Sequence, residues 1–162
     1  MKIFKSPEPL SFDQYPSVFL AGSIDMGEAE DWQQQVCNYF ANDNINIYNP
    51  RRADWDSSWE QKMENGQFNE QVNWELNAME KADLIIMNFL PDSKSPITLL
   101  ELGLHAGSKK IVVCCPDEFY RSGNVHIVCA NYTIPLFKNL HELLNNLNLK
   151  NYYNENKSVL TN

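Results

Sequence analysis

Two glutamates stand in apolar segments of the sequence, where a carboxylate is costly to place. Glu101 lies within LLELGLHAG, and Glu75 lies in a helical pattern whose apolar residues recur at three- and four-residue intervals. A buried acid needs a charged or hydrogen-bonding partner, so an acid on an apolar face often borders a cleft. Glu75 and Glu101 are therefore our candidate catalytic residues. For Glu75, a carboxyl group that is satisfied inside the core is the alternative.

Two carboxyl groups at one site are suited to glycosyl chemistry. A retaining reaction at an anomeric carbon needs an ionised carboxylate as nucleophile and a second group that handles the leaving group's proton. We expect a helix N-terminus to keep Glu101 charged for the first role, and an apolar face to raise the pKa of Glu75 for the second. No Ser-His-Asp arrangement and no metal-type spacing accompanies them, and the sequence indicates no cofactor.

The elements that must position Glu101 form a strand–helix–strand unit over residues 82–115. Residues 84–89 are a short apolar run, residues 98–108 have helical spacing, and residues 111–115 are a second apolar, β-branched run. Two parallel strands joined by a helix bring the connecting loop to the carboxyl edge of the sheet, where ligands of open α/β sheets bind. We expect Glu101 at this edge.

The rest of the chain supplies further elements of an α/β fold. We expect an irregular arm over residues 1–16, a strand beginning at 17–20, a helix over about 28–43, a strand over 45–48, a helix over about 66–82, a turn-rich loop over 116–126, a fifth strand from either 127–130 or 132–137, and a helix over 140–147.

The turn after the first strand is a candidate for binding a phosphate or sugar oxygen. Gly22, Ser23 and Asp25 lie in this turn, where backbone N–H groups can hold an anion. The segment lacks G-x-G-x-x-G, so a tight turn without a ligand is an equal alternative.

Arg51 and Arg52 begin a polar loop that also carries two tryptophans. This loop could form a wall for a nucleobase, a subunit contact, or an ordinary surface loop with half-buried tryptophans. We expect the basic doublets 51–52 and 109–110 to be solvated surface.

Composition narrows the class of protein. The 162 residues fit a single domain, with a core over about 17–147, an N-terminal arm and an Asn-rich C-terminal tail. The net charge of −8 disfavours a nucleic-acid polymer as partner. No apolar run reaches the length of a membrane span and the first residues lack a signal-peptide core, so we expect a cytoplasmic protein. Four cysteines without metal spacing suit reduced core thiols.

Four short motifs in order resemble the nucleoside 2-deoxyribosyltransferases and the related deoxynucleoside monophosphate N-hydrolases. They are FLAGSID (19–25), NWELNAMEKADLIIMNFLPD (73–92), SPITLLELGLHAGSKKIVV (95–113) and PDEFYRSGNVH (116–126). The resemblance implies that Glu101 is the nucleophile and that Glu75 is the acid that contacts the base. It also implies that Asn124 reaches the sugar's 5′-hydroxyl in a neighbouring subunit. The implied fold is flavodoxin-like, or Rossmann-like, with three layers and a five-stranded parallel sheet, in a homo-oligomer built from dimers.

Two positions depart from that family's pattern. A first-strand tyrosine that touches the nucleophile is Phe19 here, and a loop aspartate that contacts the base is Ser95. In the N-hydrolases a serine at the latter position touches a 5′-phosphate. The sequence thus leaves open whether the substrate is a nucleoside or its 5′-monophosphate. Asp92 and His126 complete the candidate substrate-binding set, and a plain turn residue is the alternative for Asp92.

Three hypotheses of function follow. The first is a transferase that exchanges the base of a 2′-deoxynucleoside for a free nucleobase through a deoxyribosyl ester of Glu101. The second is an N-glycosidase in which water resolves the same ester. The third is a nucleotide-sensing module that binds without turnover. Base preference, tolerance of a 2′-hydroxyl and oligomer size stay open.

Overall fold

After the first strand, strands and helices alternate along the described chain, and the strands form a parallel sheet. The structure, a computed structural model, describes residues 1–11, 13–24, 29–52, 56 and 58–149. Within these residues the sheet has six strands in the order β1-β3-β2-β4-β5-β6, all parallel. The strands are β1 (Lys2–Lys5), β2 (Ser17–Gly22), β3 (Asn46–Asn49), β4 (Leu84–Asn88), β5 (Ile111–Cys114) and β6 (Leu136–Phe137). Apart from β1, this is the flavodoxin-like order 2-1-3-4-5, so the predicted fold class is confirmed.

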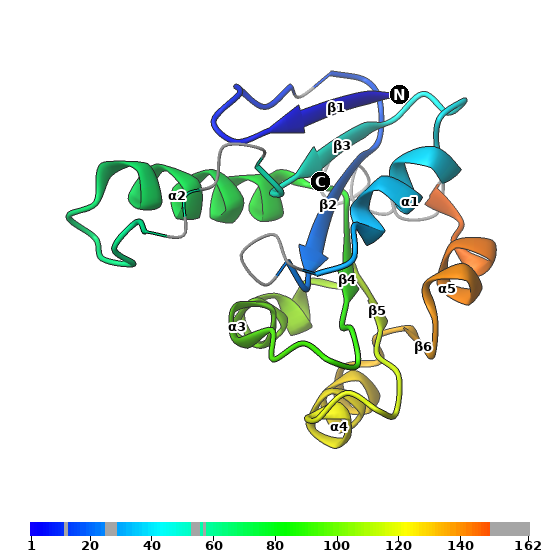
Figure 1. Cartoon of the computed structure of the whole chain (residues 1–162). Coiled ribbons are helices and arrows are strands. Elements are labelled where there is room, and N and C mark those ends of the chain that lie inside the picture. Colours follow the sequence, from blue (N-terminus) through cyan, green and yellow to red (C-terminus); the bar gives the residue numbers. More distant parts are fainter. Residues whose placement is uncertain (12, 25–28, 53–55, 57, 150–162) are drawn as a thin grey trace.

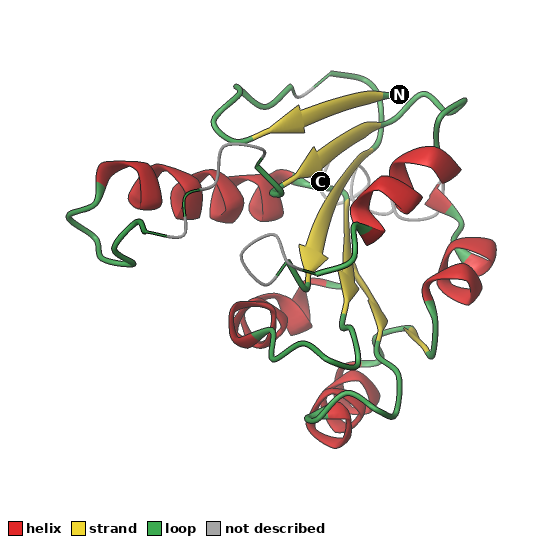
Figure 2. Ribbon diagram, viewed as in Figure 1, coloured by secondary structure: helices red, strands yellow, loops and turns green. Residues whose placement is uncertain are grey.

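Helices cover both faces of the sheet and give the predicted three layers. They are α1 (Trp32–Tyr39), α2 (Gly66–Lys81), α3 (Pro96–His105) with the short 3₁₀ turn η2 (Ala106–Ser108), α4 (Ser122–Tyr132) and α5 (Leu140–Asn146). One face packs against α1 and α5, and the other against α2, α3 and α4 (Figures 1 and 2). Both faces of the central strands are therefore buried, which explains their nearly continuous apolar sequence.

The edge strand β1 was not expected. We read residues 1–16 as irregular because of their prolines, but Lys2–Lys5 pair with β3 in parallel and make the sixth strand. The prolines all follow β1, and an edge strand with mostly exposed side chains has no apolar pattern to reveal it. The arm is also tied to α2, because the Trp74 indole N–H donates to the carbonyl of Glu8 at 2.8 Å.

Two helices differ from the sequence prediction. Helix α1 is shorter, because Asp31 caps its N-terminus by accepting a hydrogen bond from the Gln34 amide at 3.0 Å. Helix α4 occupies residues that we had read as loop and as a possible strand. Its inner side is formed by Val125 and Cys129, four residues apart, while Leu136–Phe137 supply the last strand instead.

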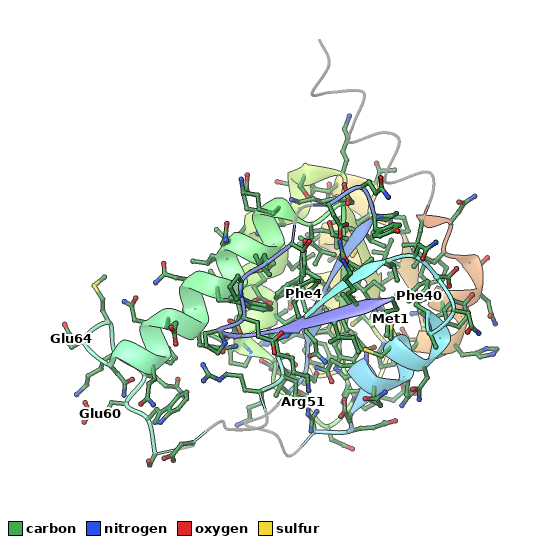
Figure 3. All side chains as sticks on the ribbon, turned by 90° about the horizontal axis from the view of Figure 1, so that it is seen from above. Met1, Phe4, Phe40, Arg51, Glu60 and Glu64 are labelled. Carbon is green, nitrogen blue, oxygen red and sulfur yellow. The ribbon has the colours of Figure 1, made fainter. Side chains whose placement is uncertain are left out.

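Lys110 was expected on the surface but is 9% exposed. Its ammonium group donates to the carbonyls of Met79 and Glu80, at 2.8 Å each, and so caps the C-terminus of α2. At its other end α2 extends past the sheet, where Glu60 and Glu64 lie in the loop that precedes it (Figure 3).

All four cysteines are free and buried, as predicted. None of the described helices is long and apolar enough to cross a bilayer.

Candidate active site

Helices α2 and α3 bring Glu75 and Glu101 close together on one face of the sheet. Glu101 is 7% exposed, on the buried side of α3. Burial raises the pKa of Glu101, and the nearby carboxylate of Glu75 raises it further, to about 8. Burial also raises the pKa of Glu75, to about 7, against the opposite effect of a hydrogen bond from Gln71. Because the two carboxyl groups repel each other when both are charged, near neutral pH they hold one proton between them.

The expectation that a helix N-terminus keeps Glu101 charged was wrong. Helix α3 begins at Pro96, so Glu101 lies in its second turn, beyond the N–H groups that the first turn leaves free. Within the described residues its carboxyl group makes no hydrogen bond, and desolvation dominates its titration. A buried acid without donors holds its proton until a charge or ligand favours the anion.

The buried side of α2 differs in part from the predicted one, for which the apolar spacing gives Phe68, Val72, Leu76 and Met79. Met79 is buried as predicted, but Leu76 is 42% exposed, and Trp74 and Ala78 face the core instead. Glu75 lies at the boundary of that buried side, partly accessible, and not in the middle of an apolar stripe. There its Oε1 accepts a hydrogen bond of 2.6 Å from Gln71 Nε2, one turn earlier in the helix.

The loop after β3 supports this arrangement. Gln71 Nε2 also donates to the carbonyl of Pro50 at 3.1 Å, and Arg52 approaches Gln71 Oε1 at 3.5 Å. The Arg52 guanidinium lies over the ring of Trp59, 5.2 Å from its centroid. Arg51 donates to the carbonyl of Ala29 at 3.0 Å. The arginine doublet therefore fixes loops at the carboxyl edge of the sheet, contrary to our surface prediction.

Sequence reasoning missed Gln71. It named the loop of Arg52 as a possible wall for a nucleobase, but it did not foresee the contact of Arg52 with Gln71. The signal that could have indicated the role of Arg52 was its position three residues after Asn49, where a strand ends at the edge that binds ligands. The other tryptophan of this loop, Trp55, lies outside the described residues.

Three buried serines join the end of β2 to the start of α3. Ser23 Oγ lies 2.6 Å from Ser95 Oγ, which lies 2.7 Å from Ser93 Oγ. Ser95 precedes α3 with a left-handed backbone, at φ 41° and ψ 50°, and its side chain does not cap the helix. Such a conformation is strained for a residue with a side chain, and the serine contacts hold it in place. The candidate residues Ser23 and Ser95 are thus in direct contact.

Gly22 allows β2 to end against β4. Its φ is +152°, and a Cβ atom there would lie 2.4 Å from the Asn88 carbonyl oxygen and 2.7 Å from the Trp32 ring. The neighbouring Ser23 donates its backbone N–H to that same carbonyl, at 3.0 Å. A glycine is needed for this close approach, which supports the tight-turn interpretation of the segment.

The other candidate residues are dispersed. Phe19 is fully buried beside Trp74, and Asp92 is exposed in the turn after β4. Asn124 is exposed on α4, whereas His126 is held by Cys115, whose carbonyl lies 3.1 Å from its Nε2. Asp25 lies outside the described residues. The structure thus groups the two glutamates in one place and the serines in another, and it leaves Asn124 and His126 on a separate helix.

Comparison with models of known protein families gives one match. Residues 15–119 match the family described as nucleoside 2-deoxyribosyltransferase like. The chain belongs to this family. The nucleoside 2-deoxyribosyltransferase-like match contains Glu75, Glu101 and the serine cluster, and it ends before α4. Asn124 and His126 therefore lie outside it. No curated protein matches the chain. The family acts on small-molecule nucleosides and bases, which places the chain among glycosyl-transferring or N-glycosidic enzymes.

Proposed function

We propose that this protein is a nucleoside 2′-deoxyribosyltransferase, with Glu101 as nucleophile and Glu75 as acid and base. The observation that carries the proposal is the coupled pair of glutamates, which retains one proton near neutral pH within a family that acts on nucleosides. One ionised and one protonated carboxyl group are what a retaining reaction at C1′ requires.

The reaction has two balanced halves. A carboxylate oxygen of Glu101 bonds to C1′ while the bond from C1′ to the base nitrogen breaks, and Glu75 gives its proton to the departing base. The nitrogen of a second base then attacks C1′, the ester bond to Glu101 breaks, and Glu75 takes up the proton that this base loses. The protein ends in its initial state.

Substrate has to move the shared proton. In the unliganded site burial raises the pKa of both carboxyl groups, so the proton belongs to the pair and not to one fixed residue. Positive charge that develops at C1′ favours the Glu101 anion, and a leaving base favours a protonated Glu75. We therefore expect a bell-shaped pH profile of kcat/KM, with limbs that belong to the pair and not to either residue alone.

Transfer and hydrolysis differ only in the acceptor. We propose transfer as the leading activity and hydrolysis by water as the alternative. The test is incubation with deoxyinosine and free adenine, followed by chromatography of the products. Formation of deoxyadenosine supports transfer, whereas hypoxanthine release that does not depend on adenine supports hydrolysis.

A matched pair of variants keeps this assay interpretable. Glu101→Gln is nearly isosteric but a poor nucleophile, and it should abolish turnover while the protein still melts cooperatively. Glu70→Gln removes an exposed acid of the same helix as Glu75 and should leave the rate unchanged. If the wild-type protein forms no deoxyadenosine and releases no hypoxanthine, binding without turnover becomes the preferred function.

A 5′-monophosphate substrate is a second candidate, and Ser95 is the residue that favours it. Its hydroxyl lies immediately before the N-terminus of α3, where N–H groups are free to bind an anion. The same assay with deoxyinosine and its 5′-monophosphate separates the two. If the phosphate is bound here, Ser95→Ala should lower kcat/KM for the monophosphate more than for the nucleoside.

We also propose that the protein works as a homo-oligomer in which Asn124 completes a neighbouring site. Ile97, Leu100 and Leu104 form an outward stripe on α3 and are each 58–59% exposed, and Ile127 on α4 is 64% exposed. Exposed apolar side chains gathered on adjacent helices are typical of subunit contacts. Asn124 lies exposed on α4, one turn before Ile127.

A further inference from the structure

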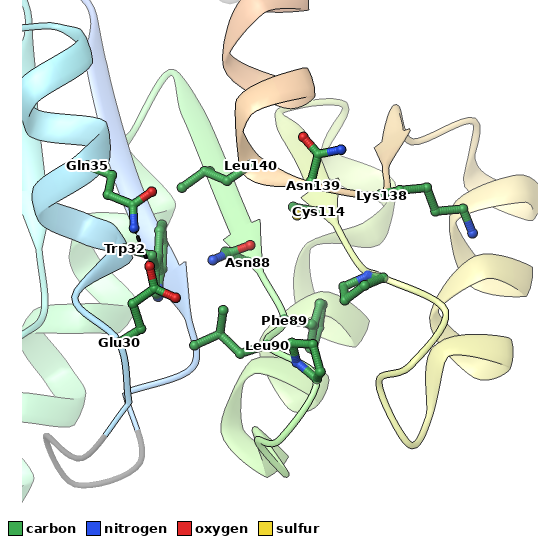
Figure 4. A pocket seen from close by; sticks show the side chains of 12 residues that line it. Glu30, Trp32, Gln35, Asn88, Phe89, Leu90, Cys114, Lys138, Asn139 and Leu140 are labelled. Carbon is green, nitrogen blue, oxygen red and sulfur yellow. Dashed lines mark hydrogen bonds between the residues drawn. The ribbon is translucent and has the colours of Figure 1, made fainter.

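A cavity opens at the carboxyl edge of the sheet, on the face opposite Glu75 and Glu101. It measures about 250 Å³ and lies where β4 and β5 end, between α1 and α5 (Figure 4). Neither glutamate and none of the three clustered serines lines it. The proposed reaction gives this cavity no role.

An unpaired amide marks the floor of the cavity. Asn88, the last residue of β4, is 2% exposed, yet its side-chain amide has no hydrogen-bond partner within the described part of the chain. Its atoms are not among the fully enclosed polar atoms that lack a partner, so they retain access to the cavity. A buried amide left unpaired lowers stability, and most such groups in folded proteins are satisfied. The partner of the amide is therefore a molecule that enters the cavity, either water or a ligand that displaces it.

The amide also indicates which partner would fit. An asparagine side chain presents a donor, Nδ2, beside an acceptor, Oδ1. Its complement is a planar edge with an acceptor beside a donor, which is the arrangement by which asparagine binds adenine through two hydrogen bonds.

Apolar side chains form the walls on either side of Asn88. In Figure 4 the amide lies between Leu90 and Leu140, with Trp32 at one end. The Trp32 indole N–H is already used, because it donates to the Ser23 carbonyl at 2.9 Å, so this side chain contributes apolar surface only. Drug-sized ligands occupy pockets of roughly 300–1,000 Å³, so a cavity of about 250 Å³ suits a single heterocycle.

The charged side chains that line the described part of the rim do not favour an anionic ligand. Lys138 is the one cation among the described residues that line the cavity, and its ammonium group is paired with Asp117. The lining acid, Glu30, accepts a hydrogen bond from Gln35. The described lining residues therefore offer no unpaired positive charge to bind a phosphate, which favours an uncharged ligand.

We propose that this cavity is a second binding site, for a free and uncharged nucleobase whose polar edge pairs with the Asn88 amide. The inference does not depend on the proposed reaction, because the two sites share no residue. In this proposal Asn88, the last residue of a buried strand, binds a ligand through its side-chain amide.

The test is calorimetric titration of adenine into the Glu101→Gln variant, in which the proposed chemistry is blocked. Asn88→Leu is then added, because leucine keeps the volume of asparagine but offers no hydrogen bond. We expect this second substitution to remove one equivalent of bound adenine, or to weaken it about tenfold or more. The matched control is Asn131→Leu, which changes an exposed asparagine on α4 and should leave the titration unchanged. Adenine binding with the same number of sites and the same affinity after Asn88→Leu would overturn the proposal, and so would the absence of any adenine binding.

Thermal unfolding without ligand gives an independent readout. If the amide serves a ligand, Asn88→Leu should leave the melting temperature unchanged or raise it, because it removes a buried group without a partner. A melting temperature lowered by more than about 5 °C would show that the amide stabilises the fold, and this would contradict the proposal. Adenine binding by Glu101→Gln can be observed even if the base-exchange assay fails, so the two proposals can fail separately.

Discussion

At Glu101, burial and the charge of Glu75 act in the same direction, and this makes the stability of the protein depend on pH. The carboxyl group titrates near 4.5 in the unfolded chain and near 8 in the folded one. Between these values the folded state binds more protons, so the free energy of unfolding falls as pH rises through the window.

Glu101→Gln removes this loss. We therefore expect the melting temperature of the variant to exceed that of the wild type by an amount that grows between about pH 5 and about pH 8, to about 10 °C. Differential scanning calorimetry over this range measures it. Glu70→Gln, which changes an exposed acid, should show no such trend. If the difference in melting temperature shrinks with rising pH, burial does not raise the pKa of Glu101.

Gln71 is a positioning residue in this account, and its effect should appear in the pH profile. Its hydrogen bond lowers the pKa of Glu75, so Gln71→Leu should move the alkaline limb of kcat/KM to higher pH. Gln67→Leu changes an exposed glutamine one turn earlier in α2 and serves as control. If the two variants have the same pH profile of kcat/KM, Gln71 does not influence the titration of Glu75.

Single residues differed in how far the sequence revealed them. Glu75 and Glu101 stood out because acids are rare in apolar segments. Gln71 did not, since a polar residue on a helix carries no pattern that distinguishes a hydrogen bond to a catalytic group from contact with water. Arg52 was recognised only as part of a loop that could border the site, because its contact with Gln71 joins residues far apart in the sequence. The direction of the Glu101 shift was also missed, because it depends on where α3 begins and on how close Glu75 lies in space.

Among the elements, the junction of β2 and β4 is the most sensitive to substitution. Gly22→Ala would place a methyl group 2.4 Å from a backbone oxygen of β4, at a φ that L-residues avoid. We expect a loss of about 3 kcal/mol in the free energy of unfolding. Gly103→Ala is the matched control: nothing lies within 4 Å of that Cβ, and a helical alanine should stabilise by about 0.5–1 kcal/mol. Urea titration measures both, and equal effects would contradict the close approach at Gly22.

The elements with strong periodicity were the predictable ones. The strand–helix–strand unit around Glu101 and the helix that ends near Ala82 followed from apolar spacing, because their buried sides repeat over several turns. Strand β1 and helix α4 were missed for opposite reasons. An edge strand buries too little to leave a pattern, whereas the apolar run inside α4 fitted a strand as well as a helix.

At the scale of the whole molecule, the outward side of α3 decides whether subunits associate. Leu100→Lys places a charge within the exposed stripe and should shift the protein toward a smaller species in sedimentation velocity, with a parallel loss of exchange activity. Met63→Lys changes a side chain that is 78% exposed, in the loop before α2, and should alter neither. If both variants sediment like the wild type, the stripe is not a subunit contact.

The central claim is that Glu101 carries the sugar between the two halves of the reaction. The direct measurement is intact-mass spectrometry of the protein after mixing with a 2′-deoxynucleoside and rapid acid quench, followed by peptide mapping of any adduct. The account predicts an added mass of one deoxyribosyl group on the peptide that contains Glu101, present in the wild type and in Glu70→Gln and lost in Glu101→Gln. Turnover without an adduct, or an adduct on another residue, would contradict it.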